Sequence, residues 1–133
     1  MDAYDELLEI LKDIDLMSQV RSLLGWDQEV LMPPKAATLR GEQLAWISRE
    51  SHRRKTSPRI GELLDELEEN SELNEIERAN VRLAREAYVK ATKLPTEFVS
   101  EMARHNSKAV ISWTEAREKN DFSIFRDDLA KSI

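Results

Sequence analysis

Two histidines, His52 and His105, are the side chains in this 133-residue sequence best suited to bind a metal or transfer a proton. The sequence has no cysteine and neither an H-E-x-x-H nor a Glu-x-x-His motif, so the helical zinc and di-iron sites built on those spacings are absent. Glu101 stands four residues before His105 on one helix face, and we expect a surface contact there. His52 stands among arginines, which repel a cation. We expect no metal ligand and no catalytic residue in this chain.

The carboxylates and hydroxyls form no recognisable catalytic pattern either. Asp27 and Glu29 are two residues apart, so on a helix they point to different sides and cannot face each other unless the helix has ended. The acidic run from Asp65 to Glu69 is typical of a solvated helix face. No glycine-rich elbow or phosphate loop surrounds any hydroxyl, so the sequence offers no nucleophile motif.

Charge and composition argue against nucleic acid and membranes as binding partners of this chain. The formal net charge is −6, whereas nucleic-acid-binding domains usually carry a basic excess. The basic cluster from Arg49 to Lys55 has no interleaved aromatic residue, and we expect it to be a charge pattern at a helix end. No apolar run is long enough to cross a bilayer, and the acidic start Met1–Glu6 has no signal-peptide pattern. With no cysteine, the sequence favours a cytoplasmic protein that binds neither nucleic acid nor membrane.

The elements that must position these side chains are helices. Only three glycines and four prolines occur, and 35% of the residues are charged, so we predict an all-α fold in which residues 1–133 form one domain. Apolar spacing, prolines and capping residues predict about six amphipathic helices in a bundle or hairpin array. They run from about Ala3 to Val30, Pro34 to Lys55, Pro58 to Glu69, Asn74 to Leu94, Pro95 to Asn120 and Asp121 to Ile133, with Ser57, Asn74 (with Glu77) and Asp121 as caps.

Each predicted helix has one apolar stripe that we expect to face the core. The stripes contain Leu7, Ile10, Leu11, Ile14, Met17, Val20 and Leu24; Ala37, Leu44, Ile47 and Ser51; Ile60, Leu63, Leu64 and Leu67; Ile76, Leu83, Ala87 and Ala91; Val99, Met102, Asn106, Ala109, Val110, Trp113 and Ala116; and Phe122, Phe125, Leu129 and Ile133. We expect Trp26, Trp46 and Trp113 to pack in the core or against another segment. The last stripe is still running at Ile133, which suggests an unfinished domain.

Several motifs in order along the chain resemble one peptidase family. The stretch from Trp26 to Pro34 is similar to the W-D-Q-E-x-x-M-P-P sequence near the start of carboxypeptidase Taq type peptidases. Further matches are R-x-E-Q-L-A at Arg40–Ala45 and S-P-x-x-G-E-L-L at Ser57–Leu64. Others lie at Asn80–Tyr88, Ala91–Pro95 and Trp113–Phe122. One departure is Arg126, since the family often has a proline shortly after the N-D-F-x-x-F run.

The resemblance implies a fold and a function. Family members are longer zinc-type metallocarboxypeptidases, whose largely helical shell surrounds a deep groove and which trim residues from peptide C-termini. The catalytic H-E-x-x-H helix and the third ligand, a glutamate, have no counterpart here, so zinc or another divalent metal is expected only in a full-length member. The resemblance implies that this chain supplies N-terminal wall or lid helices of the groove. Trp26, Asp27, Met32 and Arg40 are the residues expected on the groove side or in support of it.

We therefore expect this chain alone to be inactive and to meet peptide substrates only within a full-length enzyme. A stand-alone helical interaction or scaffold module is the alternative. The heptad-like spacing from Leu7 to Leu24 and the aromatic residues Trp113, Phe122 and Phe125 predict self-association, most simply as a dimer.

Overall fold

The computed structural model describes residues 1–133 and contains only helices, which confirms the all-α prediction. The elements are α1 (Ala3–Val30), the 3-10 helix η1 (Pro34–Ala36), α2 (Ala37–Lys55), α3 (Pro58–Glu68), α4 (Glu75–Thr92), α5 (Thr96–Lys119) and α6 (Ser123–Ser132). The predicted element list differs in one place, because Pro34 opens a separate 3-10 turn and not α2. That turn closes through a 2.9 Å bond from the Ala36 N–H to the Pro33 carbonyl.

Side chains cap the starts of α1 and α4, where Asp2 accepts from the Asp5 N–H and Asn74 accepts from the Glu77 N–H. Asn74 and Glu77 form the predicted capping box, since the Asn74 side chain accepts from the Glu77 N–H at 3.0 Å and Glu77 accepts from the Asn74 N–H at 2.9 Å. The predicted cap Asp121 lies one residue before the N-cap of α6, Phe122, and its Oδ1 accepts from the Ser123 N–H at 3.0 Å. The prediction for Ser57 is wrong, because its hydroxyl makes no capping bond and the Ile60 N–H bonds to its backbone carbonyl instead.

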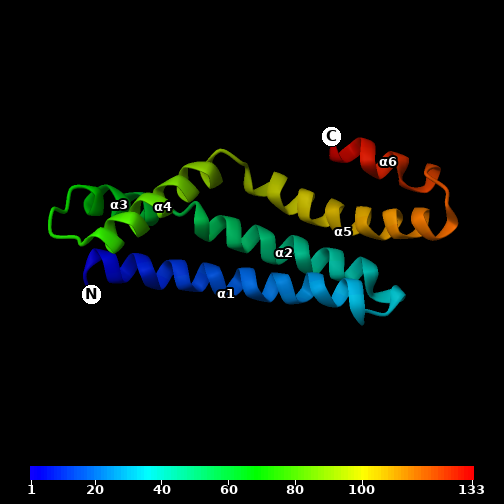
Figure 1. Cartoon of the computed structure of the whole chain (residues 1–133), viewed down its shortest axis with the longest axis horizontal. Coiled ribbons are helices and arrows are strands. Elements are labelled where there is room, and N and C mark those ends of the chain that lie inside the picture. The colour runs from blue at the N-terminus through cyan, green and yellow to red at the C-terminus, as the bar shows by residue number, and fades with distance from the viewer.

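The chain has an elongated shape built on a long helical hairpin (Figure 1). α2 runs antiparallel to α1 beside the C-terminal part of that helix, and α3 and α4 lie at the end where α1 begins. α5 follows α2, its most extensive partner, and α6 folds back along α5. The arrangement therefore has two ends, one around the start of α1 and one around its C-terminal half.

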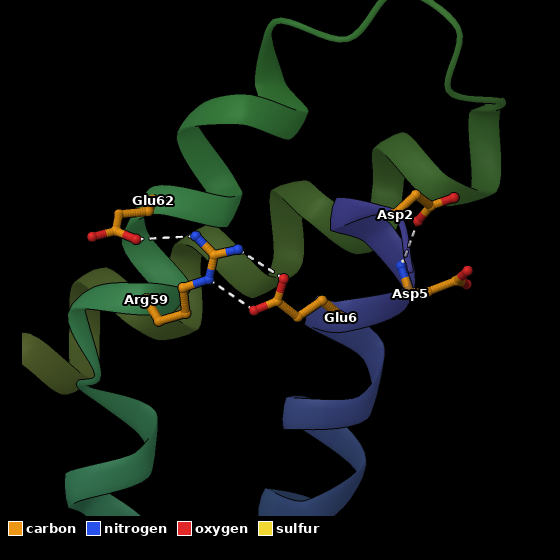
Figure 2. Close-up of polar contacts among 5 residues, drawn as sticks. All are labelled: Asp2, Asp5, Glu6, Arg59 and Glu62. Atoms are coloured by element: carbon orange, nitrogen blue, oxygen red, sulfur yellow. Dashed lines mark hydrogen bonds and ion pairs between the residues drawn. The ribbon is translucent and has the colours of Figure 1, made fainter.

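The end formed by the first half of α1 with α3, the following loop and α4 contains the apolar core, and we name it the leucine-rich end. Its nine buried residues are Leu7, Ile14, Ile60, Leu63, Leu64, Leu67, Leu73, Val81 and Ala84. An ion-pair fork joins α3 to α1 at its surface: Arg59 Nε and Nη2 donate to the two Glu6 oxygens at 2.7 Å, and Nη1 donates to Glu62 at 3.1 Å (Figure 2). The hydrogen bond from Arg59 lowers the pKa of Glu6.

The other end, which we name the layered end, comprises residues 16–30 of α1 with α2, α5 and α6. Small residues line the interface between α2 and α5: Gly41, Ala45, Ser48, Ser100, Ala103 and Ser107 are all buried. The Ser100 hydroxyl donates to the Ala45 carbonyl at 3.4 Å. Short side chains let the two helix backbones approach closely. The helices therefore pack through contacts between small residues and not between large apolar ones.

The predicted core faces of two helices are wrong. In α4, Ile76 and Leu83 are 73% and 54% exposed, and the helix packs through Val81 and Ala84. In α5, of the predicted stripe only Ala116 is buried, and the packed face contains the small residues Ser100, Ala103 and Ser107. Apolar spacing singles out large side chains, whereas the face that α5 packs against α2 contains small ones. The stripes of α3 and most of α2 are confirmed by burial.

The three tryptophans are not core residues of this chain. Trp26, Trp46 and Trp113 are each 51–55% exposed, and all lie at the layered end. Of the predicted α6 stripe, Phe122 and Ile133 are exposed, while Phe125 and Leu129 are partly buried. The large apolar side chains of the layered end thus lie mostly on its surface.

Candidate functional site

The segment that joins α1 to α2 reverses the chain tightly. The N–H groups of Leu31 and Met32 both donate to the Asp27 carbonyl, at 3.1 and 2.9 Å, and end α1. Pro33 then holds an extended conformation before η1. The reversal returns the chain so that Arg40, in the first turn of α2, lies beside the last turns of α1.

Arg40 and Asp27, two of the four predicted site residues, form an ion pair across this reversal. Arg40 Nη2 donates to Asp27 Oδ2 at 2.7 Å, Nη1 donates to the Leu24 carbonyl at 2.7 Å, and Nε donates to Gln43 Oε1 at 3.0 Å. The Arg40 side chain is 13% exposed and that of Asp27 is 32% exposed. A charge-assisted bond in partial burial is strong, and this pair joins the first turn of α2 to the last turns of α1.

Gln28 provides a second fixed contact, which the sequence analysis did not select. Its Nε2 donates to the Ser107 carbonyl at 3.1 Å and to the Ser107 hydroxyl at 2.9 Å, and so joins α1 to α5. Gln28 lies inside the W-D-Q-E motif, and this is the one sequence feature that could have identified it as a site residue. Its partner lies 79 residues away, so no local pattern could identify it.

Met32 and Trp26, the other two predicted residues, occupy different surroundings. Met32 lines a hollow of about 320 Å³ between the α1–α2 reversal and α5, together with Pro34, Val110 and Ile111. Trp26 is 53% exposed and is not part of that lining. The structure therefore brings Asp27 and Arg40 together and places Met32 and Trp26 at separate surface positions.

Both histidines are buried, which corrects the expected surface contact of His105 with Glu101. His105 Nε2 lies 3.0 Å from the Asp128 carbonyl and 2.9 Å from the Ser132 hydroxyl, and so connects α5 to α6. His52 Nε2 lies 2.9 Å from the Ala91 carbonyl. A carbonyl only accepts, so each Nε2 carries a proton. Both side chains therefore serve as links between helices.

Asp128 is the one buried carboxylate in the chain. The Ser112 hydroxyl and the Lys108 ammonium, 3.4 Å away, hold its pKa below the usual value despite burial. Because Ser112 and Lys108 belong to α5, the ionised carboxylate helps to hold α6 against α5.

No group of three or more His, Asp and Glu side chains lies close enough to hold a metal ion. No helix is both long and apolar enough to span a bilayer.

Known proteins resemble both the sequence and the fold. The model of the carboxypeptidase Taq (M32) metallopeptidase family matches residues 6–133. Thermostable carboxypeptidase 1 of Thermus thermophilus is 34% identical over 126 residues, which are 92% of this chain and 25% of that protein. Carboxypeptidase 1 of Bacillus subtilis is 33% identical over 129 residues, 96% of this chain and 26% of that protein. The crystal structure of BsuCP superposes with a TM-score of 0.92 at 32% identity, covering 97% of this chain and 26% of that one. The chain thus spans about a quarter of the length of these relatives.

Proposed function

Because the chain belongs to the carboxypeptidase Taq (M32) metallopeptidase family, we propose that it is the N-terminal portion of a metal-dependent carboxypeptidase. The whole enzyme would release C-terminal amino acids from peptides, and these helices would form a wall or lid of its substrate groove. Alone, the chain is not catalytic. The names of the carboxypeptidase relatives support the reaction class.

The observation that carries this proposal is the uncovered apolar surface of the layered end. Large apolar side chains there stay 37–70% exposed, although the same helices bury serines and two histidines. These side chains are Leu16, Val20, Leu23, Trp26, Val30, Leu31, Leu39, Trp46, Phe98, Met102, Val110, Ile111, Trp113 and Phe122. Extended exposed apolar patches on proteins mark interaction surfaces. We infer that the rest of the enzyme, about three quarters of a relative's length, covers part of this surface.

The residues of this chain do not fit a catalytic metal. Catalytic zinc sites use three protein ligands, and the two histidines here are occupied by bonds between helices. We propose that zinc or another divalent metal is held by residues outside this chain, where it would activate water and polarise the scissile carbonyl. We also propose a cytoplasmic location, which the cysteine-free sequence supports.

For the four candidate residues we propose two roles. Asp27 and Arg40 hold α1 and α2 at a fixed angle and are positioning residues. Trp26 and Met32 present apolar surface to the groove or to its neighbouring segments. The Arg40 and Asp27 side chains are only 13% and 32% exposed, which suits a positioning role. The indole of Trp26 is exposed, which suits contact with a neighbouring segment.

A chimeric enzyme tests the proposal. The quarter of Bacillus subtilis carboxypeptidase 1 that matches this chain is replaced by residues 1–133. We expect the chimera to hydrolyse an N-blocked dipeptide, and this chain alone, with Zn²⁺ or Co²⁺ added, to release no amino acid. Circular dichroism controls for folding of both proteins. Chelator-sensitive release by the chain alone, or a folded but inactive chimera, would contradict the proposal.

A second proposal, self-association of the isolated chain, rests on α1. Leu7 and Ile14 of the expected seam are buried within the chain, so that seam is not available. The available stripe is Leu16, Val20, Leu23 and Val30, whose spacing suits helix pairing. We expect a dimer by light scattering over a range of concentrations, and Leu23→Glu should shift it toward monomer. A mass of one chain at every concentration would rule this out.

A further inference from the structure

A hollow lined by seven polar and three apolar residues lies where α1, α2 and α5 meet at the layered end. It has a volume of about 210 Å³, and its lining includes two cationic side chains, Arg21 and Lys55, and three serines. Ser18 comes from α1, and Ser48 and Ser51 come from α2. No carboxylate belongs to the lining. The hollow is therefore positively charged and rich in hydrogen-bond donors.

Most of these donors have free capacity. Arg21 Nε donates to the Ser48 hydroxyl at 3.0 Å, which leaves the two terminal nitrogens of the guanidinium without a partner. Ser51 is 93% buried by residue, lines the hollow, and its hydroxyl forms no hydrogen bond, although no fully buried polar atom of the chain lacks one. The Ser51 hydroxyl therefore opens into the hollow.

The charges of the hollow are unbalanced, unlike those of its neighbours. Arg53 pairs with Glu50 at 2.8 Å and Arg54 pairs with Asp13 at 3.3 Å. Arg21 and Lys55 form no ion pair within 4 Å. Two cations that line one hollow repel each other, and a bound anion would remove that repulsion.

We propose that this hollow binds a tetrahedral oxyanion of the phosphate class. Arg21 would supply the planar N–H pair that suits such oxygens, Lys55 a second charge, and Ser18 and Ser51 hydroxyl donors. A water molecule occupies about 30 Å³ in the liquid, so 210 Å³ holds one oxyanion with some water. His52 is a wall residue, since its nitrogens contact Thr96 and Ala91.

Two features set the expected strength. Lys55 ends α2, and the negative end of a helix dipole opposes an anion. The formal net charge of −6 also gives no general attraction to anions. We therefore expect binding in the millimolar range, and any saturable binding to come from this local cluster. The site is independent of the proposed peptidase role, because none of its residues belongs to the candidate groove set.

The test is a titration of the chain with inorganic phosphate at constant ionic strength, followed by amide NMR shifts. We expect saturable shifts at Ser48 and Ser51. Arg21→Gln and Lys55→Gln should each weaken binding about tenfold, as expected for loss of a charge-assisted bond. Lys55 is exposed, so its variant should keep the fold, and amide dispersion verifies this. Arg82→Gln, on the exposed face of α4, is the matched control and should leave the dissociation constant unchanged.

Titrations with sulfate, acetate and chloride separate the ligand classes. Sulfate should compete with phosphate, and acetate and chloride should bind at least tenfold more weakly. Shifts that grow linearly, as with chloride, would overturn the proposal. So would unchanged affinity in both variants, or acetate binding as tightly as phosphate, which would make the hollow a carboxylate site.

Discussion

The leucine-rich end and the layered end use different means to hold helices together. The first buries a cluster of nine apolar residues, including Leu63 and Leu64, which are 0% exposed. The second contains all seven buried polar residues of the chain, which are Ser48, Ser51, His52, Ser100, His105, Ser107 and Asp128. Apolar burial is non-directional, whereas hydrogen bonds fix positions. The leucine-rich end therefore relies mainly on apolar burial, while the layered end combines five buried apolar residues with the buried polar ones.

The contrast also separates stability from interaction. At the layered end small and polar residues face inward, so the tryptophans are left on the outside. The exposed part of an indole adds no burial energy to the isolated chain, but it gives a partner a large apolar surface to contact. The layered end is thus the region that a neighbouring segment would cover.

The largest effect should come from the core of the leucine-rich end. Leu64→Ala removes a fully buried side chain and leaves a cavity, so we expect a loss of about 2–5 kcal/mol in the free energy of unfolding. Leu39→Ala, at a 61% exposed position of the layered end, is the control and should change it by less than about 0.5 kcal/mol. Urea denaturation followed by circular dichroism measures both. Equal losses would mean that the two ends share one core.

The next effect compares arginines of the two ends. Arg40→Gln leaves the partly buried Asp27 without its charge partner and removes a bond to the Leu24 carbonyl, so we expect a loss of about 1.5–3 kcal/mol. Arg59→Gln breaks the more exposed fork with Glu6 and should cost less.

Added salt should distinguish the Arg40→Gln variant from the Arg59→Gln variant. The Arg59 effect should shrink in 0.5 M NaCl, since exposed pairs are screened, and the Arg40 effect should persist. In the chimeric enzyme, Asp27→Ala should lower activity through misplaced helices. Full activity together with reduced stability would restrict Asp27 to packing.

Local signals predicted where helices begin and end, but not which faces meet. Asn74 with Glu77 and the proline pair at Pro33 act within a few residues, and their effects could be predicted. The inward faces of α4 and α5 could not, because each helix has apolar residues on two sides and partner shape decides between them. Ser107, for example, is buried where α5 lies against Gly41 of α2.

The candidate site shows the same limit. Asp27 and Arg40 were selected through the family motif, and their ion pair depends on the reversal at Pro33 and Pro34. The bond from Gln28 to Ser107 and the hollow beside Arg21 depend on how three helices pack. Such contacts between distant residues leave no periodic trace in the sequence.

Acid should loosen the two ends differently. The pKa values of Asp128 and Glu6 are both lowered in the folded chain. Each carboxylate thus contributes stability that is full above its unfolded pKa, about 4, and is lost as pH falls through the lower folded value. We expect the contribution of these two carboxylates to the unfolding free energy to be full above about pH 5 and to fall below about pH 4.

Variants assign the acid effect to each end. Asp128→Asn should remove part of the fall in both low and high salt, since Asp128 is buried with Ser112, Lys108 and His105 around it. Glu6→Gln should remove part of it only in low salt. Stability that rises on acidification would contradict the lowered pKa values.

The smallest effect compares glycines in helices of the two ends. An added Cβ at Gly41 would lie 3.7 Å from the Ser107 hydroxyl oxygen, an ordinary contact, whereas at Gly61 it would lie 3.0 Å from the Tyr88 hydroxyl oxygen and 3.3 Å from ring carbons. Alanine gains about 0.5–1 kcal/mol over glycine inside a helix. Gly41→Ala should therefore raise the unfolding free energy by up to that amount. At Gly61 the ring must shift within the tightly packed leucine-rich end, so Gly61→Ala should gain nothing or lose stability. Urea denaturation of the two variants, with Gly25→Ala as the unhindered reference, decides it. If Gly41→Ala were destabilised and Gly61→Ala stabilised, the expected order of packing would be reversed. The α2–α5 contact would then be packed more tightly than the α3–α4 contact.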